Sequence, residues 1–217
     1  MKRGLFISID GPDGTGKTTQ TALLAEHLQA IKRKVVKTRE PGTTDIHVCR
    51  AIRNILLNPA YKDQIPPAAD LCLFSADRAI HTSYFIKPKL EEGYDVISDR
   101  FVDSTTVYQG IGSGLPLETV LLLNQVVTQG LYPDITFFLD ANNEQTNSKI
   151  TTKEFGTHDR IESRSHLYHI KIIEGFRGLA KLSPERIKLI PYRKDEPNTV
   201  HLDIRSYIDK LIEQHQQ

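Results

Sequence analysis

The stretch LFISIDGPDGTGKTTQ, residues 5–20, decides the fold of this chain. Its segment from Gly11 to Thr18 matches the phosphate-binding pattern G-x-x-x-x-G-K-[ST] at every position. An apolar run of strand type precedes the pattern, and apolar residues recur at helical spacing after it, over residues 17–31. A strand, a glycine-rich turn and a helix start surround an anion with backbone N–H groups, and the helix dipole adds to their positive potential. The sequence therefore predicts a nucleotide-binding P-loop.

The residue types within the P-loop fit MgATP. Lys17 is expected to reach the β- and γ-phosphates, and the Thr18 hydroxyl is expected to ligate Mg²⁺. Glycine at positions 11, 14 and 16 permits a close approach of the backbone to the phosphates. The predicted nucleotide-binding set is Gly11, Pro12, Asp13, Gly14, Thr15, Gly16, Lys17, Thr18 and Thr19.

Apolar strand-type runs alternate with helical patterns along the rest of the chain. We expect strands over residues 5–9, 34–38, 95–99, 135–140 and 187–191, and helices over 17–31, 46–57, 66–90, 105–108, 116–129, 159–182 and 200–214. This alternation predicts an α/β, three-layer P-loop NTPase fold, with a five-stranded parallel sheet and helices on both faces. No linker divides residues 1–217, so we expect a single domain.

Composition excludes several classes of protein. The net charge is +1, from 28 Lys and Arg against 27 Asp and Glu, which gives no overall field that would attract nucleic acid or anionic lipid. Cys49 and Cys72 have no metal-binding spacing and are expected to be free thiols in a reducing compartment. No apolar run approaches the roughly 18 residues of a membrane span, and a cleaved signal would remove the P-loop. We therefore expect a soluble, cytoplasmic protein.

Four further strings stand in register with the P-loop. They are TREPGT at 38–43, LFSADR at 73–78, DRFVDSTTVYQG at 99–110 and HDRIE at 158–162. With the P-loop, in this order and spacing, the chain resembles the thymidylate kinase family from about Leu5 to the last strand. The resemblance implies a nucleoside monophosphate kinase that converts MgATP and dTMP to ADP and dTDP. It also implies a homodimer, for which the apolar faces of residues 71–84 and of the helices after Asp99 are candidates.

The resemblance implies a role for each residue that binds the acceptor's base and sugar. Phe74 resembles the aromatic face that stacks on thymine, although core packing is the competing interpretation of its helical spacing. Arg78 and Gln109 resemble the groups that read the polar edge of the base. Tyr108 matches the ring that lies under the sugar and excludes a 2′-hydroxyl. The complete predicted acceptor-binding set is Arg39, Arg53, Phe74, Arg78, Arg100, Ser104, Tyr108 and Gln109.

On the phosphate side, Arg39 and Arg100 resemble the pair that grips the acceptor phosphate, with Arg53 as a third contact. Asp13 matches the acid near the sugar 3′-hydroxyl and the Mg²⁺ shell, and Asp99 matches the acid at the metal. Phosphoryl transfer depends on positioning and on neutralising charge, and arginine suits bidentate contact with phosphate. The acceptor phosphate is already mostly a dianion near neutral pH, since its second pKa is about 6, so no dedicated general base is needed.

Three places depart from the family pattern. Asp10 precedes Gly11 where the family usually has glutamate, and the usual Pro-Gly-Gly-Thr reads PGTT at 41–44. The family also tends to supply an arginine to the transferred group from the P-loop or from the lid. Here the P-loop position is Gly14, and the expected lid, at about 142–160, offers Thr151, Lys153 and Phe155. We expect Lys153 or Arg160 to take that role, so the predicted catalytic set is Lys17, Arg100, Asp13, Lys153 and Arg160.

Two alternatives remain open. In the first alternative, the acceptor is another deoxynucleoside monophosphate or a nucleoside. A nucleoside would leave Arg39 and Arg100 without a phosphate to hold. The second alternative is a regulatory P-loop module. It would leave the Asp-Arg strand end and the aromatic pocket without a role, and the chain has no Asn-Lys-x-Asp string for guanine selection.

Overall fold

The structure is a computed structural model of the chain and describes residues 3–43, 45–141, 159–161 and 163–216. The expected lid over 142–158, including Lys153, lies outside this range. Every pair of neighbouring strands in the described part runs parallel, in the order β2-β3-β1-β4-β5. The strands are β1 (Phe6–Asp10), β2 (Val35–Arg39), β3 (Asp95–Asp99), β4 (Ile135–Asp140) and β5 (Ile187–Pro191). The predicted five-stranded parallel sheet is confirmed, with each strand within one residue of its expected bounds.

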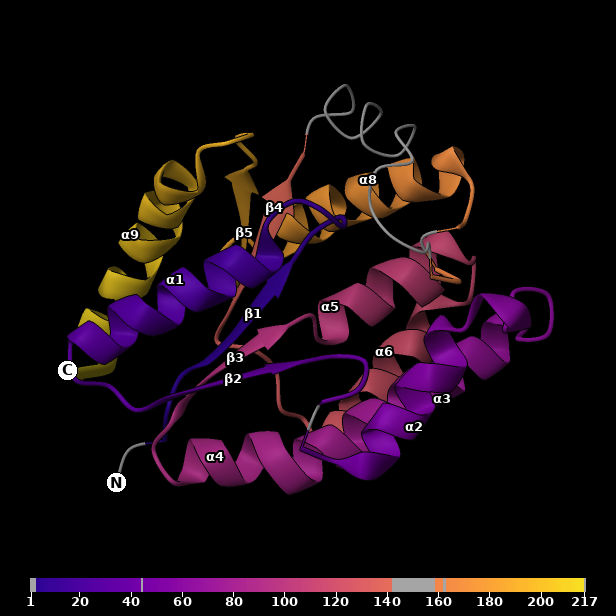
Figure 1. Cartoon of the computed structure of the whole chain (residues 1–217), viewed down its shortest axis with the longest axis horizontal. Helices are drawn as coiled ribbons and strands as arrows, with labels where there is room; N and C mark the ends of the chain where they lie inside the picture. Colours follow the sequence, from indigo (N-terminus) through magenta and orange to yellow (C-terminus); the bar gives the residue numbers. More distant parts are fainter. Residues whose placement is uncertain (1–2, 44, 142–158, 162, 217) are drawn as a thin grey trace.

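Side chains along β1 alternate between the two faces of the sheet, as in any strand. Ile7 and Ile9 belong to the apolar cluster formed with α1 (Lys17–Ala30) and α9 (Pro197–Gln216). Phe6 points the other way, into a cluster with α4 (Lys87–Glu91) and α5 (Val102–Thr105). Figure 1 shows α1 and α9 side by side over one face of the sheet. The predicted helices on both faces are therefore confirmed.

The remaining helices cover the second face of the sheet or pack farther out on the same side. Phe138 of β4 packs on α8 (His166–Leu182), with its ring stacked on Phe176 at a centroid distance of 4.3 Å. Farther out, α3 packs against α2 and α6, and the three lie together in Figure 1. Their bounds are α2 (His47–Leu57), α3 (Pro67–His81) and α6 (Leu117–Thr128), with a short 3-10 turn at Pro59–Tyr61 and π-helical segments at Thr82–Ile86 and Thr106–Gly112.

Four helix boundaries differ from expectation by three residues or more, and two of these are that α5 begins at Val102 and α9 at Pro197, each three residues early. The helix expected to end at residue 108 continues to Gly112, because the glycines that follow allow close packing rather than ending the helix. A Cβ at Gly112 would come within 2.7 Å of the Tyr168 and Ile172 side chains. The expected helix start at Asp159 is also wrong. α8 begins after Ser165, whose hydroxyl accepts the N-capping hydrogen bond from the Tyr168 amide.

No helix in the described part of the chain combines the length and the apolar character that crossing a bilayer requires.

Candidate active site

The P-loop joins β1 to α1 at the carboxyl edge of the sheet. Gly14 and Gly16 adopt left-handed φ values of 75° and 86°, which side chains disfavour, and Gly16 caps α1. The Thr15 hydroxyl donates to the Pro12 carbonyl at 2.7 Å and closes the turn. The loop therefore ends with the free N–H groups of a 14-residue helix, which is the geometry that binds phosphate.

Lys17 is buried and lies across this loop. Its Nζ donates to the Pro12 carbonyl at 3.1 Å and to Asp13 Oδ1 at 2.8 Å. Burial lowers the pKa of Lys17 and the nearby Arg100 charge adds to that shift, while Asp13 and Asp99 oppose it. The ammonium therefore lies in a crowded group of charges at the phosphate-binding end of α1.

Arg100 faces Lys17 across Asp13. Its Nη2 donates to the same Asp13 oxygen at 2.8 Å, and its guanidinium lies over the Tyr108 ring, 5.2 Å from the centroid. The pKa of Asp13 is lowered because Lys17 and Arg100 outweigh the opposing effect of burial. Two cations converge on one carboxylate, which leaves positive charge available for phosphate oxygens.

The backbone of Arg100 is fixed in an unusual conformation. Its φ is 73°, uncommon for a residue with a side chain. The Arg100 amide donates to the Ile9 carbonyl at 3.0 Å, and the Ser98 hydroxyl donates to the Arg100 carbonyl at 2.7 Å. These bonds tie the Arg100 backbone to β1 and to the end of β3, and from there the side chain reaches Asp13 of the P-loop. Backbone strain of this kind is concentrated at functional sites.

Arg39 and Arg53 form a second positive group beside the first. Arg39 ends β2 in register with Asp99 of β3 and is exposed. Arg53 of α2 donates to the Pro41 carbonyl at 2.6 Å, and burial together with the Arg39 charge lowers its pKa. The Arg39 guanidinium has no hydrogen bond or ion pair with any residue that the structure describes. Bringing these like charges together is unfavourable by itself and favours a bound anion here.

The altered PGTT turn keeps the glycine that this arrangement needs. Gly42 has a φ of 79°, and a Cβ there would come within 2.4 Å of the Arg53 side chain. Loss of the second glycine at Thr43 is tolerated because Thr43 is buried and its hydroxyl accepts a hydrogen bond from Thr38 at 3.2 Å.

The two predicted metal ligands are oxygen donors near the P-loop lysine. Asp99 is half-buried at the end of β3, close enough to Lys17 to affect its pKa. Thr18 is exposed in the first turn of α1. Neither side chain hydrogen-bonds to a residue within the described ranges. One carboxylate and one hydroxyl suit Mg²⁺, which usually keeps waters and takes further oxygens from substrate phosphates. The residues therefore fit the predicted ion.

Phe74 lies half-buried on α3, outside the three apolar clusters of the described chain. Tyr108 is also half-buried, and burial raises the pKa of its hydroxyl to about 12, so it stays neutral. The Tyr108 ring also packs against the apolar cluster of Phe138 and Phe176 and lies beneath the Arg100 guanidinium.

Arg78 is placed differently from the expectation that it reads the base. It is buried, and each of its three guanidinium nitrogens has a protein partner. Nε donates to Glu40 at 2.8 Å, Nη1 donates to Thr105 at 2.6 Å, and Nη2 donates to the Phe101 carbonyl at 3.1 Å. A base contact by Arg78 would require it to exchange one of these partners.

Gln109 and Arg160 meet at a buried carboxylate that sequence reasoning missed. Asp70 of α3 accepts from Gln109 Nε2 at 3.0 Å and forms an ion pair with Arg160. Arg160 Nε also donates to the Leu56 carbonyl at 2.7 Å, and the side chain is 2% exposed. The expectation that Arg160 swings toward the transferred phosphoryl group is not supported in this conformation, because its charge is already neutralised inside the protein. The sequence around Asp70 did not indicate this pairing, because an acidic residue in the first turn of a helix is ordinary.

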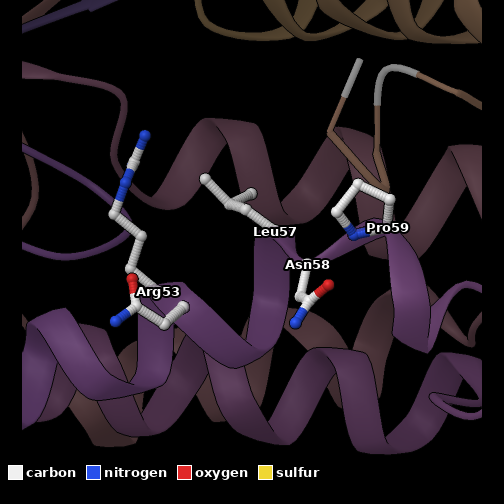
Figure 2. A pocket seen from close by; sticks show the side chains of 5 residues that line it. Arg53, Leu57, Asn58 and Pro59 are labelled. Carbon is white, nitrogen blue, oxygen red and sulfur yellow. The ribbon is translucent and has the colours of Figure 1, made fainter. Parts of the chain in front are cut away.

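A pocket of about 350 Å³ borders the Arg53 group at the end of α2. Figure 2 shows the Arg53 side chain on one side of Leu57 and Pro59 on the other. The lining residues are Arg53, Asn54, Leu57, Asn58 and Pro59. Of these lining residues, only Arg53 belongs to the predicted acceptor site. The pocket therefore lies beside that site and does not coincide with it.

Comparison with known proteins finds relatives that match nearly the whole chain. The family model described as thymidylate kinase matches residues 9–204. A thymidylate kinase of Exiguobacterium sp. strain AT1b is 39% identical over 99% of this chain and 97% of its own length, and one of Symbiobacterium thermophilum is 40% identical over 96% and 94%. The crystal structure of thymidylate kinase from Ehrlichia chaffeensis superposes with a TM-score of 0.74 at 34% identity, covering 95% of this chain and 99% of that one.

Proposed function

This chain belongs to the thymidylate kinase family, and from that premise we propose which of its residues transfer a phosphoryl group from ATP to dTMP. The observation that carries the proposal is the bridge in which Asp13 accepts from both Lys17 and Arg100, each at 2.8 Å. One cation belongs to the ATP side and the other to the acceptor side. The bridge thus lies where two phosphate chains have to meet.

The donor side is the P-loop. Its backbone N–H groups and Lys17 bind the β- and γ-phosphates and stabilise the charge that develops as the bond to the leaving oxygen breaks. Mg²⁺, held by Thr18 and Asp99, supplies further neutralisation of the phosphate oxygens when it is bound. These residues are on a strand end and a helix start, so they are fixed before the reaction begins.

The acceptor side is formed by three arginines and two aromatic rings. Arg39, Arg53 and Arg100 hold the dTMP phosphate against the repulsion of the γ-phosphate, and correct orientation provides much of the rate. Phe74 stacks on the base, and Tyr108 lies under the sugar. With the acceptor phosphate already a dianion, the arginines need only aim its oxygen at the γ-phosphorus.

The acceptor is tested by ADP release from ATP with dTMP, dUMP, dGMP and thymidine supplied separately. We expect dTMP to give the highest kcat/KM and thymidine to give background rates, because thymidine has no phosphate for the arginines. Thymidine turnover equal to that of dTMP would contradict the acceptor assignment. ATP turnover that no acceptor stimulates would favour a regulatory P-loop protein instead.

Three further parts of the proposal concern regions or properties beyond the described site. Lys153, outside the described residues, is proposed to supply the lid charge, because Arg160 is paired internally. The chain is proposed to act as one domain and to work in the cytoplasm. The two free cysteines, Cys49 and Cys72, agree with a reducing compartment.

We also propose a homodimer through α6. Leu121, Leu122 and Val126 lie on this helix with 47%, 63% and 63% of their surface exposed, an apolar group of the kind that subunit contacts cover. Replacing Leu122 and Val126 with aspartate should convert a dimer to a monomer. The measurement is the molar mass in solution by light scattering. Leu182→Asp is the matched control, since Leu182 is 81% exposed at the end of α8. An unchanged mass for the α6 variant, or a monomeric parent chain, contradicts the proposal.

A further inference from the structure

A buried carboxylate lies beneath Arg100. Asp10 is the last residue of β1 and is fully buried. Strand alternation directs its side chain away from the face of Ile9, toward the face that α5 covers. Ser104 of α5 and Ser8 of β1 each donate a hydroxyl hydrogen bond to this carboxylate, the latter at 2.8 Å. Asp10 is thus joined to the helix that follows Arg100.

The direction of these hydrogen bonds matters. A serine hydroxyl has one proton, and Ser104 donates it to Asp10. The Ser104 oxygen therefore presents its lone pairs to Arg100, whose Nη1 donates to it at 3.3 Å. A chain of donors runs from Arg100 through Ser104 to Asp10. The carboxylate sets the orientation of the hydroxyl, and the hydroxyl holds one branch of the guanidinium.

Asp10 has no exposed surface through which to contact a nucleotide in this structure, so we assign it no direct part in the proposed transfer. Burying a carboxylate is costly, and burial raises the pKa of Asp10 to about 6 against the opposing effects of Arg100 and the two serines. An apolar side chain would avoid that cost. It would also free Ser104 to turn its proton toward Arg100, which would remove the hydrogen bond. The buried Asp10 carboxylate is therefore explained by its effect on the orientation of the Ser104 hydroxyl.

We propose that Asp10 is a positioning residue: through the Ser104 hydroxyl, its carboxylate holds Arg100 between Asp13 of the P-loop and the acceptor phosphate. The inference rests on the role of Arg100 in the proposed function. Asp10 directly precedes the P-loop in sequence, yet its hydrogen bonds lead to the acceptor side. Removal of the Asp10 carboxylate should therefore raise the KM for dTMP and leave ATP binding intact.

The first test is steady-state kinetics of Asp10→Asn with each substrate varied in turn. The neutral amide conserves volume, accepts hydrogen bonds more weakly and competes to donate to Ser104. We expect the KM for dTMP to rise about 5- to 10-fold, as for loss of one ordinary hydrogen bond, and the KM for ATP to stay within about twofold. Ser8→Ala is the matched control: this serine bonds the other oxygen of the same carboxylate, so its KM for dTMP should change less than twofold. A rise in the KM for ATP alone would mean that Asp10 supports the P-loop and would overturn the inference.

The second test places Asp10→Asn in an Arg100→Ala background. Because the effect of Asp10 passes through Arg100, the second substitution should not raise the KM for dTMP further. A full additional rise would show that Asp10 acts by another route and would overturn the inference, even with Arg100 confirmed. If Arg100→Ala alone leaves the KM for dTMP unchanged, the proposed function of Arg100 fails first. Ser104→Ala is the second variant should Asp10→Asn fail to fold, and the same non-additivity is expected of it.

Discussion

Replacing Lys17 with methionine is expected to lower kcat by about 10³-fold, the largest effect of any single substitution in the site. Removing one preorganised donor from a developing negative charge costs about 10²- to 10³-fold in other enzymes, and Lys17 combines a full charge with burial. Its Nζ lies between the P-loop carbonyl of Pro12 and the carboxylate of Asp13. No other ammonium lies at this position in the described chain. The measurement is ADP release at saturating ATP and dTMP.

The fold should tolerate this change. Methionine is close to lysine in length, and loss of the ammonium leaves Asp13 paired with Arg100. We therefore expect the thermal midpoint to stay within a few degrees of the parent. Lys210→Met, on the exposed side of α9, is the matched control and should keep full activity. A Lys17→Met enzyme with more than a tenth of the parent kcat would show that the P-loop backbone alone neutralises the transferred phosphoryl group.

Replacing Arg100 with alanine is expected to raise the KM for dTMP about 10- to 100-fold and to lower kcat at least tenfold. Hydrogen bonds to charged groups contribute about 1.5–3 kcal/mol each, and Arg100 is proposed to give the acceptor phosphate more than one. The KM for ATP should change much less, because Lys17 and the loop amides remain. Steady-state kinetics with each substrate varied separates these effects.

Arg100→Lys distinguishes charge from shape at this position. Lysine keeps the charge but loses the planar fork that reaches Asp13 and Ser104 together. We expect it to recover less than a tenth of the activity lost in the alanine variant. Arg205→Lys, on α9 and half-exposed, is the control for a change of the same kind elsewhere. Full activity of Arg100→Lys would reduce the role of Arg100 to that of a point charge.

The layers of the fold were predictable because they depend on local pattern. The strands at 95–99, 135–140 and 187–191 were placed at their observed bounds, since short apolar runs bounded by turn residues have few other solutions. The π-helical segment through Gly112 was not predictable. Its glycines look like turn residues until the Tyr168 and Ile172 side chains of α8, more than 50 positions away, are packed against them.

Some of the charged contacts were likewise predictable from the sequence, and others were not. Lys17, Asp13 and Arg100 were predicted as one group, because parallel strands bring their ends to one edge. Glu40, Asp70 and Asp10 were not recognised as partners of arginines or serines. Nothing local in the sequence marks these acids as paired, and only their burial shows that their charges must be satisfied within the protein.

By itself, the sequence determined the P-loop, the order of strands and helices, and the set of arginines near the strand ends. It could do so because periodicity and motif spacing are properties of neighbouring residues. The tertiary structure decided which arginines are paired inside the protein: Arg78 and Arg160 are neutralised by acids 38 and 90 positions away, which leaves Arg39, Arg53 and Arg100 as the arginines that we propose for the acceptor phosphate. The physical reason is that a buried guanidinium must be paired, and the fold alone brings distant residues together to pair with it.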